Sequence, residues 1–429
     1  RQISSTGTRG SAARGTAPVP FCVVFAAPWR HPQHATRLAR SIVNMASTRW
    51  GIMGTGAIAN DFAQALKTTP GAVLHAAASR SQASADAFAK KHGIARAFGS
   101  YEELAADGEV DIVYVATPHA FHRDNVLLCL RAGRHVLCEK PLAVSAAQVA
   151  ECVAAAKERN LFLMEGMWTR FFPVARAIRK VVSEGAIGKV VSVSASLGFK
   201  LEPSFNPRLY EPALAGGALF DVGIYPALWI SMILGTPSKV TAHARLLPSG
   251  VDQQTFATLE YEGGAMANLE CGFTGSLPND VTIVGETGYI RTGRPTQCPE
   301  RYTLVTRQAS RDPLAPAPPL TPPSPPPPPP PPARAWPAPR QGDEPDPMLL
   351  RARRVEVEEP LDPPNPGLAP GYNYVGSQGL RFEAEAVQQA LREGRTEHPE
   401  MTLDESLAAA RLFDEIRAQI GLRYPWDMD

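Results

Sequence analysis

Short apolar runs alternate with amphipathic stretches from Arg49 to Met164. The runs have the length of buried parallel strands, and the stretches between them have the length of helices. We expect strands at Trp50–Met53, Val73–Ala78, Val110–Ala116, His135–Cys138 and Leu161–Met164, and helices at Ala57–Lys67, Ser84–Lys91, Phe121–Arg131 and Ser145–Arg159. Regular alternation of strand and helix predicts a doubly wound parallel sheet, and hence an α/β domain over residues 48–166.

The pattern changes after Pro173, where alternation of apolar and polar residues takes over. We expect helices at Pro173–Ser183 and Asp221–Leu234, and strands at Val190–Ser196, Val240–Arg245, Thr255–Tyr261, Ala265–Gly272 and Val281–Val284. Two further helices are expected at Ser377–Arg392 and Leu403–Ile420. The second domain, over 167–307 and 351–429, is therefore expected to be α+β, with a large, mostly antiparallel sheet and with helices that pack back on the first domain.

The prolines are concentrated in one segment. Residues 311–370 contain 23 of the 42 prolines, including eight in a row at Pro325–Pro332. Proline has no amide proton and a fixed φ, so this stretch cannot join a sheet. We predict a disordered insertion over 308–350 that lengthens one hairpin, because strand-like sequences flank it at Arg301–Val305 and Val355–Glu358. A ligand for a proline-binding module is the alternative interpretation.

The first 44 residues contain six arginines and no acidic residue, which leaves 37 basic and 42 acidic residues for the rest. This segment is either an organelle transit peptide or translated sequence ahead of Met45, and residues 1–47 are expected to stay outside the packed core. A transit peptide would direct the protein to a plastid or mitochondrion; otherwise we expect it in the cytoplasm. The remaining body has a net charge of −5. It is a poor match for nucleic acid, whose binding depends on clustered Lys and Arg.

Membrane and metal proteins are also disfavoured. No run approaches about 18 apolar residues, so we expect no membrane-spanning helix. The six cysteines are spread without CxxC spacing, which predicts reduced thiols and no zinc site. His119 and His122 lie close together in the sequence, but no further ligand set accompanies them, so we expect no metal.

A glycine-rich turn follows the first predicted strand. Gly54 permits a tight turn, and Gly56 lets a pyrophosphate approach the backbone where the first helix begins. Ala59 takes the place of the usual third glycine and is still small. In its strand–turn–helix context, this pattern predicts a Rossmann dinucleotide site.

The end of the second predicted strand indicates which dinucleotide is bound. An NAD site usually places an acid here, about 20 residues after the glycine turn, to bind the ribose 2′-hydroxyl. Ser79 and Arg80 occupy this position instead, and they suit a 2′-phosphate. We therefore predict NADP. A solvated surface arginine is the alternative for Arg80.

Further polar motifs follow later strands. Thr117–His119 and Glu139–Pro141 each come after a predicted strand, and the carboxyl ends of parallel strands share the edge where ligands bind. Because Lys140 precedes a proline, its backbone is extended and its side chain can be aimed into the cleft. Asp221 and Tyr225 are four residues apart on one predicted helix, so they lie on one face. They either share proton transfer in the cleft or serve as a helix N-cap and a core residue.

Taken together, these motifs resemble the Gfo/Idh/MocA oxidoreductases. The order is the Gly-x-Gly turn, Thr-Pro-His at 117–119, Glu-Lys-Pro at 139–141, and Gly-Gly-Ala-Leu-Phe-Asp-Val-Gly-Ile-Tyr at 216–225. Within that family, residues 161–173 and the ending at 421–425 are similar to the branch of dimeric dihydrodiol dehydrogenases and NADP-linked D-xylose 1-dehydrogenases. Tyr225 stands where many relatives carry His, and it indicates the same branch. The resemblance covers 49–306 and 355–429.

The resemblance implies an NADP-dependent enzyme that moves hydride between nicotinamide and a carbon of a D-xylose-like sugar or a trans-dihydrodiol. It implies Lys140 and Tyr225 as the catalytic pair, with Asp221 in support. The residues expected to line the cofactor are Gly54, Gly56, Ala57, Ile58, Ser79, Arg80, Thr117, Pro118, His119, His122, Glu139, Lys140, Trp168 and Arg170. The residues expected to border the substrate are Trp168, Arg170, Phe199 and Tyr225. The sheet domain is expected to form a homodimer through its open face.

An acid–base mechanism follows from this expectation. A free tyrosine has a pKa of about 10, which is too high for a good base at neutral pH. A nearby Lys140 ammonium would favour the phenolate and so lower the pKa of Tyr225. The alternative function is a non-catalytic, dinucleotide-sensing regulatory or scaffold protein of the same fold, which would have no need of a Lys140–Tyr225 pair.

Overall fold

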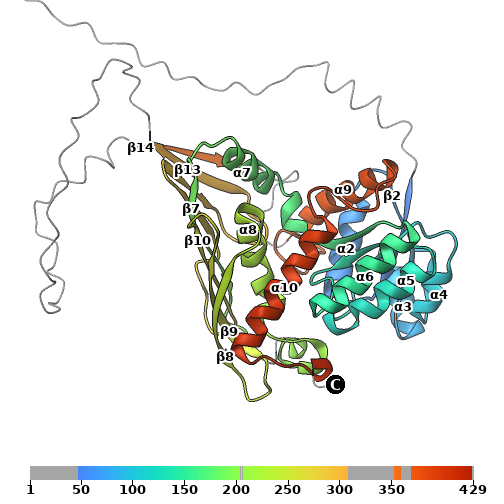
Figure 1. The fold of residues 1–429 in the computed structure, drawn as a ribbon. Helices are drawn as coiled ribbons and strands as arrows, with labels where there is room; N and C mark the ends of the chain where they lie inside the picture. Colours follow the sequence, from blue (N-terminus) through green and yellow to red (C-terminus); the bar gives the residue numbers. More distant parts are fainter. Residues whose placement is uncertain (1–46, 203, 205, 308–351, 359–368, 428–429) are drawn as a thin grey trace, which may run out of the picture. The chain divides into compact units, whose positions relative to one another are not determined.

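The computed structural model describes residues 47–202, 204, 206–307, 352–358 and 369–427. The expected leader over 1–47, apart from Ser47, and the expected insertion over 308–350 lie outside the described residues. What the sequence predicts for these two segments therefore stays a prediction. The described chain contains two sheets, one formed from its first part and one from its later part (Figure 1).

Six parallel strands form the first sheet, in the order β3-β2-β1-β4-β5-β6. This is the strand order of the Rossmann fold, and it confirms the predicted doubly wound sheet. The strands are β1 (Thr48–Met53), β2 (Ala72–Ala78), β3 (Arg96–Phe98), β4 (Ile112–Val115), β5 (His135–Glu139) and β6 (Leu163–Gly166). The helices between them are α2 (Ala57–Lys67), α3 (Gln82–His92), α4 (Tyr101–Ala106), α5 (His122–Arg131) and α6 (Ala146–Arg159).

The central strands are the most deeply buried elements of this domain. All four residues of β4 are buried, and so are the last four of β5. A strand covered on both faces has a continuous apolar sequence, which is why the pattern predicts it. The pattern misses β3, which has three residues, and α4, which has six. The Ser100 hydroxyl caps α4 by accepting the Glu103 amide at 3.2 Å, and this Ser-x-x-Glu spacing is the signal that marks the helix.

Eight strands form the second sheet, in the order β14-β13-β12-β11-β7-β10-β9-β8. Every neighbouring pair is antiparallel except β7 with β10, which confirms the expected mostly antiparallel sheet. The strands are β7 (Val190–Gly198), β8 (Lys239–Leu246), β9 (Asp252–Glu260), β10 (Met266–Gly272), β11 (Val281–Gly285), β12 (Gly288–Thr292), β13 (Arg301–Arg307) and β14 (Ala352–Glu358). The pattern misses β12, because only two residues separate it from β11.

Helices pack on one face of this sheet. α8 contacts β7 and β10, and α10 contacts both β8 and the Rossmann helix α6 (Figure 1). α9 packs against α2. The helices are α7 (Pro173–Ser183), α8 (Ile224–Leu234), α9 (Leu380–Arg392) and α10 (Leu403–Ile420). The chain therefore returns to the Rossmann sheet after completing the second one, and its last helices join the two.

The helix that the sequence predicts over Asp221–Leu234 begins differently. Residues Leu219–Gly223 form a π-helical turn, η6, and α8 starts only at Ile224. Such turns are rare and often mark functional positions. The 23-residue stretch Pro212–Leu234 is also apolar enough to cross a membrane by length and composition alone, although the sequence predicts no such stretch. Its most apolar 18 residues are 67% buried inside the protein, as in the core helix of a globular domain.

Candidate active site

The glycine turn after β1 leaves room for a phosphate. Gly54 has a φ of +100°, and a Cβ there would meet the Ala116 carbonyl oxygen at 2.8 Å, so only glycine fits this approach to β4. Gly56 and Ala57 are exposed, Ile58 is half-buried, and no side chain caps the start of α2. The first amides of α2 are therefore open to an anion, as pyrophosphate binding requires.

Ser79 and Arg80 follow β2, beside the glycine turn. The Ser79 and Thr55 hydroxyls are 3.4 Å apart, and Arg80 is exposed. Burial raises the pKa of Tyr101, at the start of α4, and the Arg80 guanidinium opposes this rise. In a Rossmann fold the adenine ribose is bound at this strand end. Two hydroxyls and a guanidinium at this place fit a 2′-phosphate.

Lys140 reaches from the Rossmann sheet to the second domain. It follows β5, and its Nζ donates a hydrogen bond to the main-chain oxygen of Asp221 at 2.7 Å. The same Nζ lies 5.0 Å from the centre of the Tyr225 ring. Burial lowers the pKa of Lys140, and the Asp221 and Glu139 carboxylates partly oppose this. The structure thus brings together the three side chains that the resemblance implies for catalysis.

Tyr225 is 9% exposed, and its hydroxyl oxygen accepts a hydrogen bond from Trp168 Nε1 at 3.1 Å. Burial raises the pKa of Tyr225 well above its usual value, and the Glu139 carboxylate adds to the rise. The expectation of a pKa lowered by Lys140 is wrong for this structure. The Lys140 ammonium is directed at a carbonyl oxygen and at the ring face, and does not compensate for the burial of the phenol.

The Asp221 carboxylate pairs with an arginine that no sequence motif indicates. Arg208 Nη2 lies 2.8 Å from Asp221 Oδ1, and Arg208 comes from the short helical turn Pro207–Tyr210. Burial would raise the pKa of Asp221, but the Lys140 and Arg208 charges outweigh it and the pKa is lowered. Asp221 lies inside η6, which excludes the interpretation of Asp221 as a helix N-cap.

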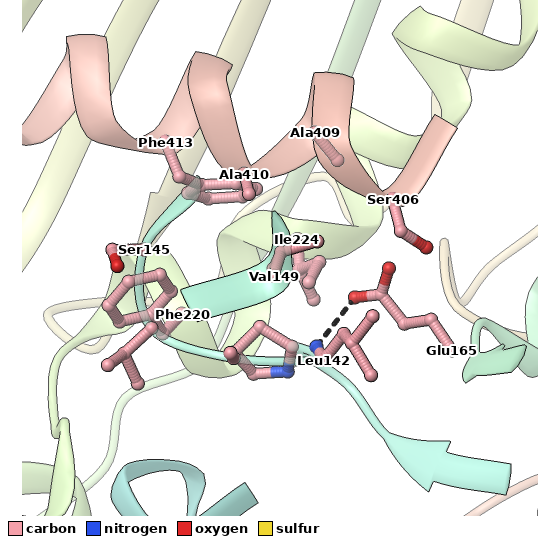
Figure 2. A pocket seen from close by; sticks show the side chains of 13 residues that line it. Leu142, Ser145, Val149, Glu165, Phe220, Ile224, Ser406, Ala409, Ala410 and Phe413 are labelled. Atoms are coloured by element: carbon pink, nitrogen blue, oxygen red, sulfur yellow. Dashed lines mark hydrogen bonds between the residues drawn. The ribbon is translucent and has the colours of Figure 1, made fainter. Parts of the chain in front are cut away.

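Two buried glutamates hold the segment that carries Lys140. Tyr114 donates a hydrogen bond to Glu139, and the Leu142 amide donates to Glu165 at 2.9 Å (Figure 2). Burial raises the pKa of both carboxyl groups. The pocket beside this segment, between Glu165 and α10, has room for about one water molecule and is too small for a sugar or diol.

His119 and His122 support the strand ends. The His122 ring lies between the carbonyl oxygens of Thr117 and Pro141, each at 2.7 Å, so it joins the segments that follow β4 and β5. Burial lowers the pKa of His119 well below its usual value, so that ring is neutral near pH 7. Burial also lowers the pKa of His122 to about 4, whereas its two carbonyl contacts oppose this, because only a protonated ring donates from both nitrogens. Pro118, half-buried, lies between Thr117 and His119. Within the described ranges, no group of three or more His, Cys, Asp or Glu could hold a metal ion.

Comparison with known proteins decides the family. Residues 48–167 match the oxidoreductase family with an NAD-binding Rossmann fold, and residues 175–291 match the GFO/IDH/MocA C-terminal domain. The trans-1,2-dihydrobenzene-1,2-diol dehydrogenase of Sus scrofa is 36% identical over 88% of this chain and 98% of its own. The Xenopus laevis enzyme of that name is 37% identical over 88% of this chain and 100% of its own. The chain belongs to the Gfo/Idh/MocA oxidoreductase family.

Solved structures agree with this assignment. A 3-ketoreductase from Actinomadura kijaniata, in complex with NADP and TDP-benzene, is 26% identical, with a TM-score of 0.67 over 87% of this chain and 98% of that chain. A levoglucosan dehydrogenase with NADH shares the fold at 18% identity, with a TM-score of 0.69 over 87% of this chain and 97% of that chain. The protein is therefore a Gfo/Idh/MocA oxidoreductase with an NAD(P)-binding Rossmann domain, and the resemblance seen in the sequence is confirmed.

Arg170, which the resemblance implies for the cofactor and substrate, lies away from this group. Arg170 is 2% exposed, and its guanidinium contacts Glu405 at 2.6 Å and the Met401 sulfur at 3.2 Å. The Arg170 guanidinium therefore pairs with the first turn of α10, and the structure does not place it beside the expected cofactor residues. Phe199 directly follows β7, where it is half-buried against the main core.

A further contact near the cofactor helix is invisible to sequence motifs. Asp61, buried on α2, accepts hydrogen bonds from the main-chain amides of Asn373 at 2.7 Å and Tyr374 at 2.9 Å. The Asn373 side chain also donates to the Ala57 carbonyl oxygen at 3.0 Å. The segment before α9 is thus fixed to the first turn of the dinucleotide helix. The one sequence signal for this contact is an acidic residue, Asp61, among the apolar positions of the α2 sequence.

Proposed function

We propose that this Gfo/Idh/MocA protein is an NADP-dependent dehydrogenase that moves hydride between nicotinamide and a hydroxyl-bearing carbon of a sugar or diol. The observation that carries the proposal is the Lys140–Asp221–Tyr225 group, which stands at the carboxyl end of β5 on the same sheet edge as the Gly54 turn. The cofactor residues fit the group they would hold, because the start of α2 is uncapped and Ser79 and Arg80 replace the acid expected for NAD.

Bound nicotinamide supplies the hydride chemistry, and the protein handles the proton. Burial keeps Tyr225 protonated near neutral pH, so its hydroxyl can donate a proton to a carbonyl oxygen in the reductive direction. In the oxidative direction the phenolate must accept the alcohol proton, and the phenolate becomes more populated as pH rises. An ammonium has three donors, and Lys140 uses one on Asp221, so others remain to polarise the reacting oxygen.

The substrate class is drawn from the relatives and is tested directly. The Sus scrofa and Xenopus laevis relatives are named for trans-1,2-dihydrobenzene-1,2-diol, and a D-xylose-like aldopyranose offers the same alcohol chemistry. We would assay purified protein with NADP on a panel of pentoses, hexoses and trans-dihydrodiols by NADPH absorbance, and assay NADPH oxidation with the matching carbonyl compounds. We expect turnover on at least one member. A protein that binds NADP but turns over none of them would leave this proposal without support.

Arg80 is expected to set the preference for NADP. Arg80→Ser removes the guanidinium that would pair with the 2′-phosphate, so we expect the Kd for NADP to rise by about 10- to 100-fold, with the Kd for NAD unchanged. Calorimetric titration measures both. Arg131→Ser is the matched control, because Arg131 is an exposed arginine in the last turn of α5, at the opposite edge of the sheet. Equal weakening of both dinucleotides by Arg80→Ser would contradict the assignment.

We also propose a homodimer through the open face of the second sheet. Met266, Ser192, Val284 and Tyr289 are direct neighbours across β10, β7, β11 and β12. Three of them are apolar and exposed, at 48% for Met266, 36% for Val284 and 41% for Tyr289. Phe256 lies on β9 with 46% exposure, and it shares this face because its paired residue Glu270 is an even number of positions from Met266. Such a row on an unpacked sheet face suits a second copy of the same chain.

Charged residues introduced into this row of the sheet are expected to dissociate the homodimer. Met266→Lys with Val284→Lys places four like charges in a twofold interface, so we expect dimerisation to weaken by more than about 100-fold. Sedimentation equilibrium gives the mass. Val73→Lys is the control, because Val73 is 40% exposed and lies on β2 of the Rossmann sheet, away from this row. A wild-type protein that stays monomeric at micromolar concentration would refute the homodimer.

A further inference from the structure

The hydroxyl of Tyr225 has a defined donor in the structure. Trp168 Nε1 lies 3.1 Å from the Tyr225 oxygen, and the two side chains are 6% and 9% exposed. An indole N–H can only donate, so the tyrosine oxygen must accept in this bond. The Tyr225 proton is then directed away from Trp168, and the oxygen keeps one lone pair for another partner.

The Lys140 ammonium is not the donor to the Tyr225 oxygen. Lys140 Nζ donates to the Asp221 main-chain oxygen at 2.7 Å and lies over the Tyr225 ring, 5.0 Å from its centre. A cation over a ring face interacts with the π system and places no donor on the phenol oxygen. The hydrogen bond that favours the phenolate therefore comes from Trp168.

The position of the indole is fixed by its surroundings. Trp168 begins the short helical turn Trp168–Phe171, which follows β6 and precedes α7. Its ring meets Phe172 edge to face, with centroids 5.3 Å apart and planes at 74°. A ring held in this way cannot follow the tyrosine as it changes its protonation state, so the hydrogen bond acts as a preorganised donor.

We propose that Trp168 is a positioning residue that holds the Tyr225 oxygen, aims its proton at the reacting oxygen and stabilises the phenolate when that proton has been transferred. This role rests on the proposed function, and it differs from contact with cofactor or substrate because Trp168 acts through Tyr225. Hydrogen bonding to a charged form favours that form, so loss of the indole N–H makes the phenolate harder to form.

Several other groups act on the same tyrosine. Glu139 and Lys140 face it from the end of β5, Asp221 from η6, and the Cys298 thiol from the loop before β13. Glu139, Asp221 and Cys298 disfavour the phenolate, as does burial, whereas the Trp168 bond favours it. The Trp168 hydrogen bond thus opposes the rise in the pKa of Tyr225 that burial and the surrounding acidic groups cause.

The test compares two tryptophan-to-phenylalanine variants. Trp168→Phe keeps a ring and removes the N–H. Trp229→Phe is the matched control, because Trp229 is buried on α8 and its Nε1 donates to the Thr296 carbonyl oxygen at 2.8 Å. For Trp168→Phe we expect oxidative kcat to fall about tenfold and the apparent pKa of kcat to rise by about one unit. For Trp229→Phe we expect no shift of the pH profile.

Two results would overturn the role. One is a wild-type kcat and pH profile for Trp168→Phe. The other is a rise in substrate KM alone, which a simple wall of the substrate site would give. If Trp168→Phe does not fold, Trp168→His keeps a ring N–H of smaller size and is expected to retain the wild-type pH profile; a one-unit shift in that variant would count against the proposal.

Failure of the proposed function can be told apart from failure of this inference. Phenolate absorbance of Tyr225 is obtained from the difference between each protein and its Tyr225→Phe derivative, and it needs no turnover. We expect the tyrosine to titrate at higher pH in Trp168→Phe than in wild type, whether or not a substrate is found. An unchanged titration would refute the hydrogen bond's role, whereas an inactive wild-type protein with a shifted titration would refute only the proposed reaction.

Discussion

Replacing Tyr225 by phenylalanine is expected to lower kcat by about 10²- to 10⁴-fold, the contribution of one well-placed acid–base group. The substitution removes the hydroxyl that accepts from Trp168 and keeps the ring beneath Lys140. NADP binding should change little, because Tyr225 belongs to α8 and the dinucleotide turn belongs to β1 and α2. Steady-state kinetics with the best substrate, together with calorimetric titration of NADP, measures both quantities.

The control for this variant is Tyr261→Phe. Tyr261 is 8% exposed in the second domain and directly follows β9, so the change removes a buried hydroxyl from a place without catalytic groups. Its kcat should stay near the wild-type value. A Tyr225→Phe enzyme that keeps its rate within about threefold would show that another group moves the proton, because a loss that small lies far below the acid–base range.

Lys140→Met is expected to lower kcat by about 100-fold or more while leaving the fold intact. The change keeps the aliphatic stem but removes the ammonium that contacts Asp221 and the Tyr225 ring. Burial already lowers the pKa of Lys140, so the folded protein holds this charge less readily than water does. Its loss should therefore not reduce the Tm, and the missing activity can be assigned to the site. Kinetics and thermal unfolding give the two readings.

Lys189→Met is the matched control for Lys140. Lys189 Nζ also donates to a main-chain carbonyl oxygen, that of Gly263 at 2.9 Å, but on the exposed surface of the second domain. This variant should keep wild-type kinetics. Equal losses in the two variants would mean that the assay responds to general damage, and a fully active Lys140→Met enzyme would remove Lys140 from the mechanism.

The parts of the fold that are predictable from the sequence depend on local patterns. β4 is a continuous apolar run because both of its faces are buried, and the Gly54 turn can be recognised because one backbone conformation requires glycine. Lys140 follows β5, as the Glu-Lys-Pro motif after a strand predicts, and its side chain contacts Asp221. In contrast, η6 escapes prediction, because the helix that follows it is apolar on all sides and has no periodic stripe that an extra residue would displace.

The parts that escape prediction depend on long-range contacts. The Asp61–Asn373 contact spans 312 positions, and no local pattern connects the two residues. Arg208 meets Asp221 from a short turn with no regular spacing. The pKa of Tyr225 is also a property of the assembled core, because burial and Glu139 together outweigh the effect expected from Lys140. Chemical roles can therefore be proposed from motifs, whereas protonation states require the packed structure.

The pairing of β13 with β14 has a practical consequence. Partners run from Arg301 with Glu358 to Arg307 with Ala352, so the two ends of the 308–351 segment meet at one point of the sheet. Antiparallel partners have Cα atoms about 5 Å apart, and the strands themselves maintain that separation. For protein engineering, the junction between β13 and β14 is a natural insertion point for a reporter domain or an affinity handle, because the paired strands already hold its two ends together.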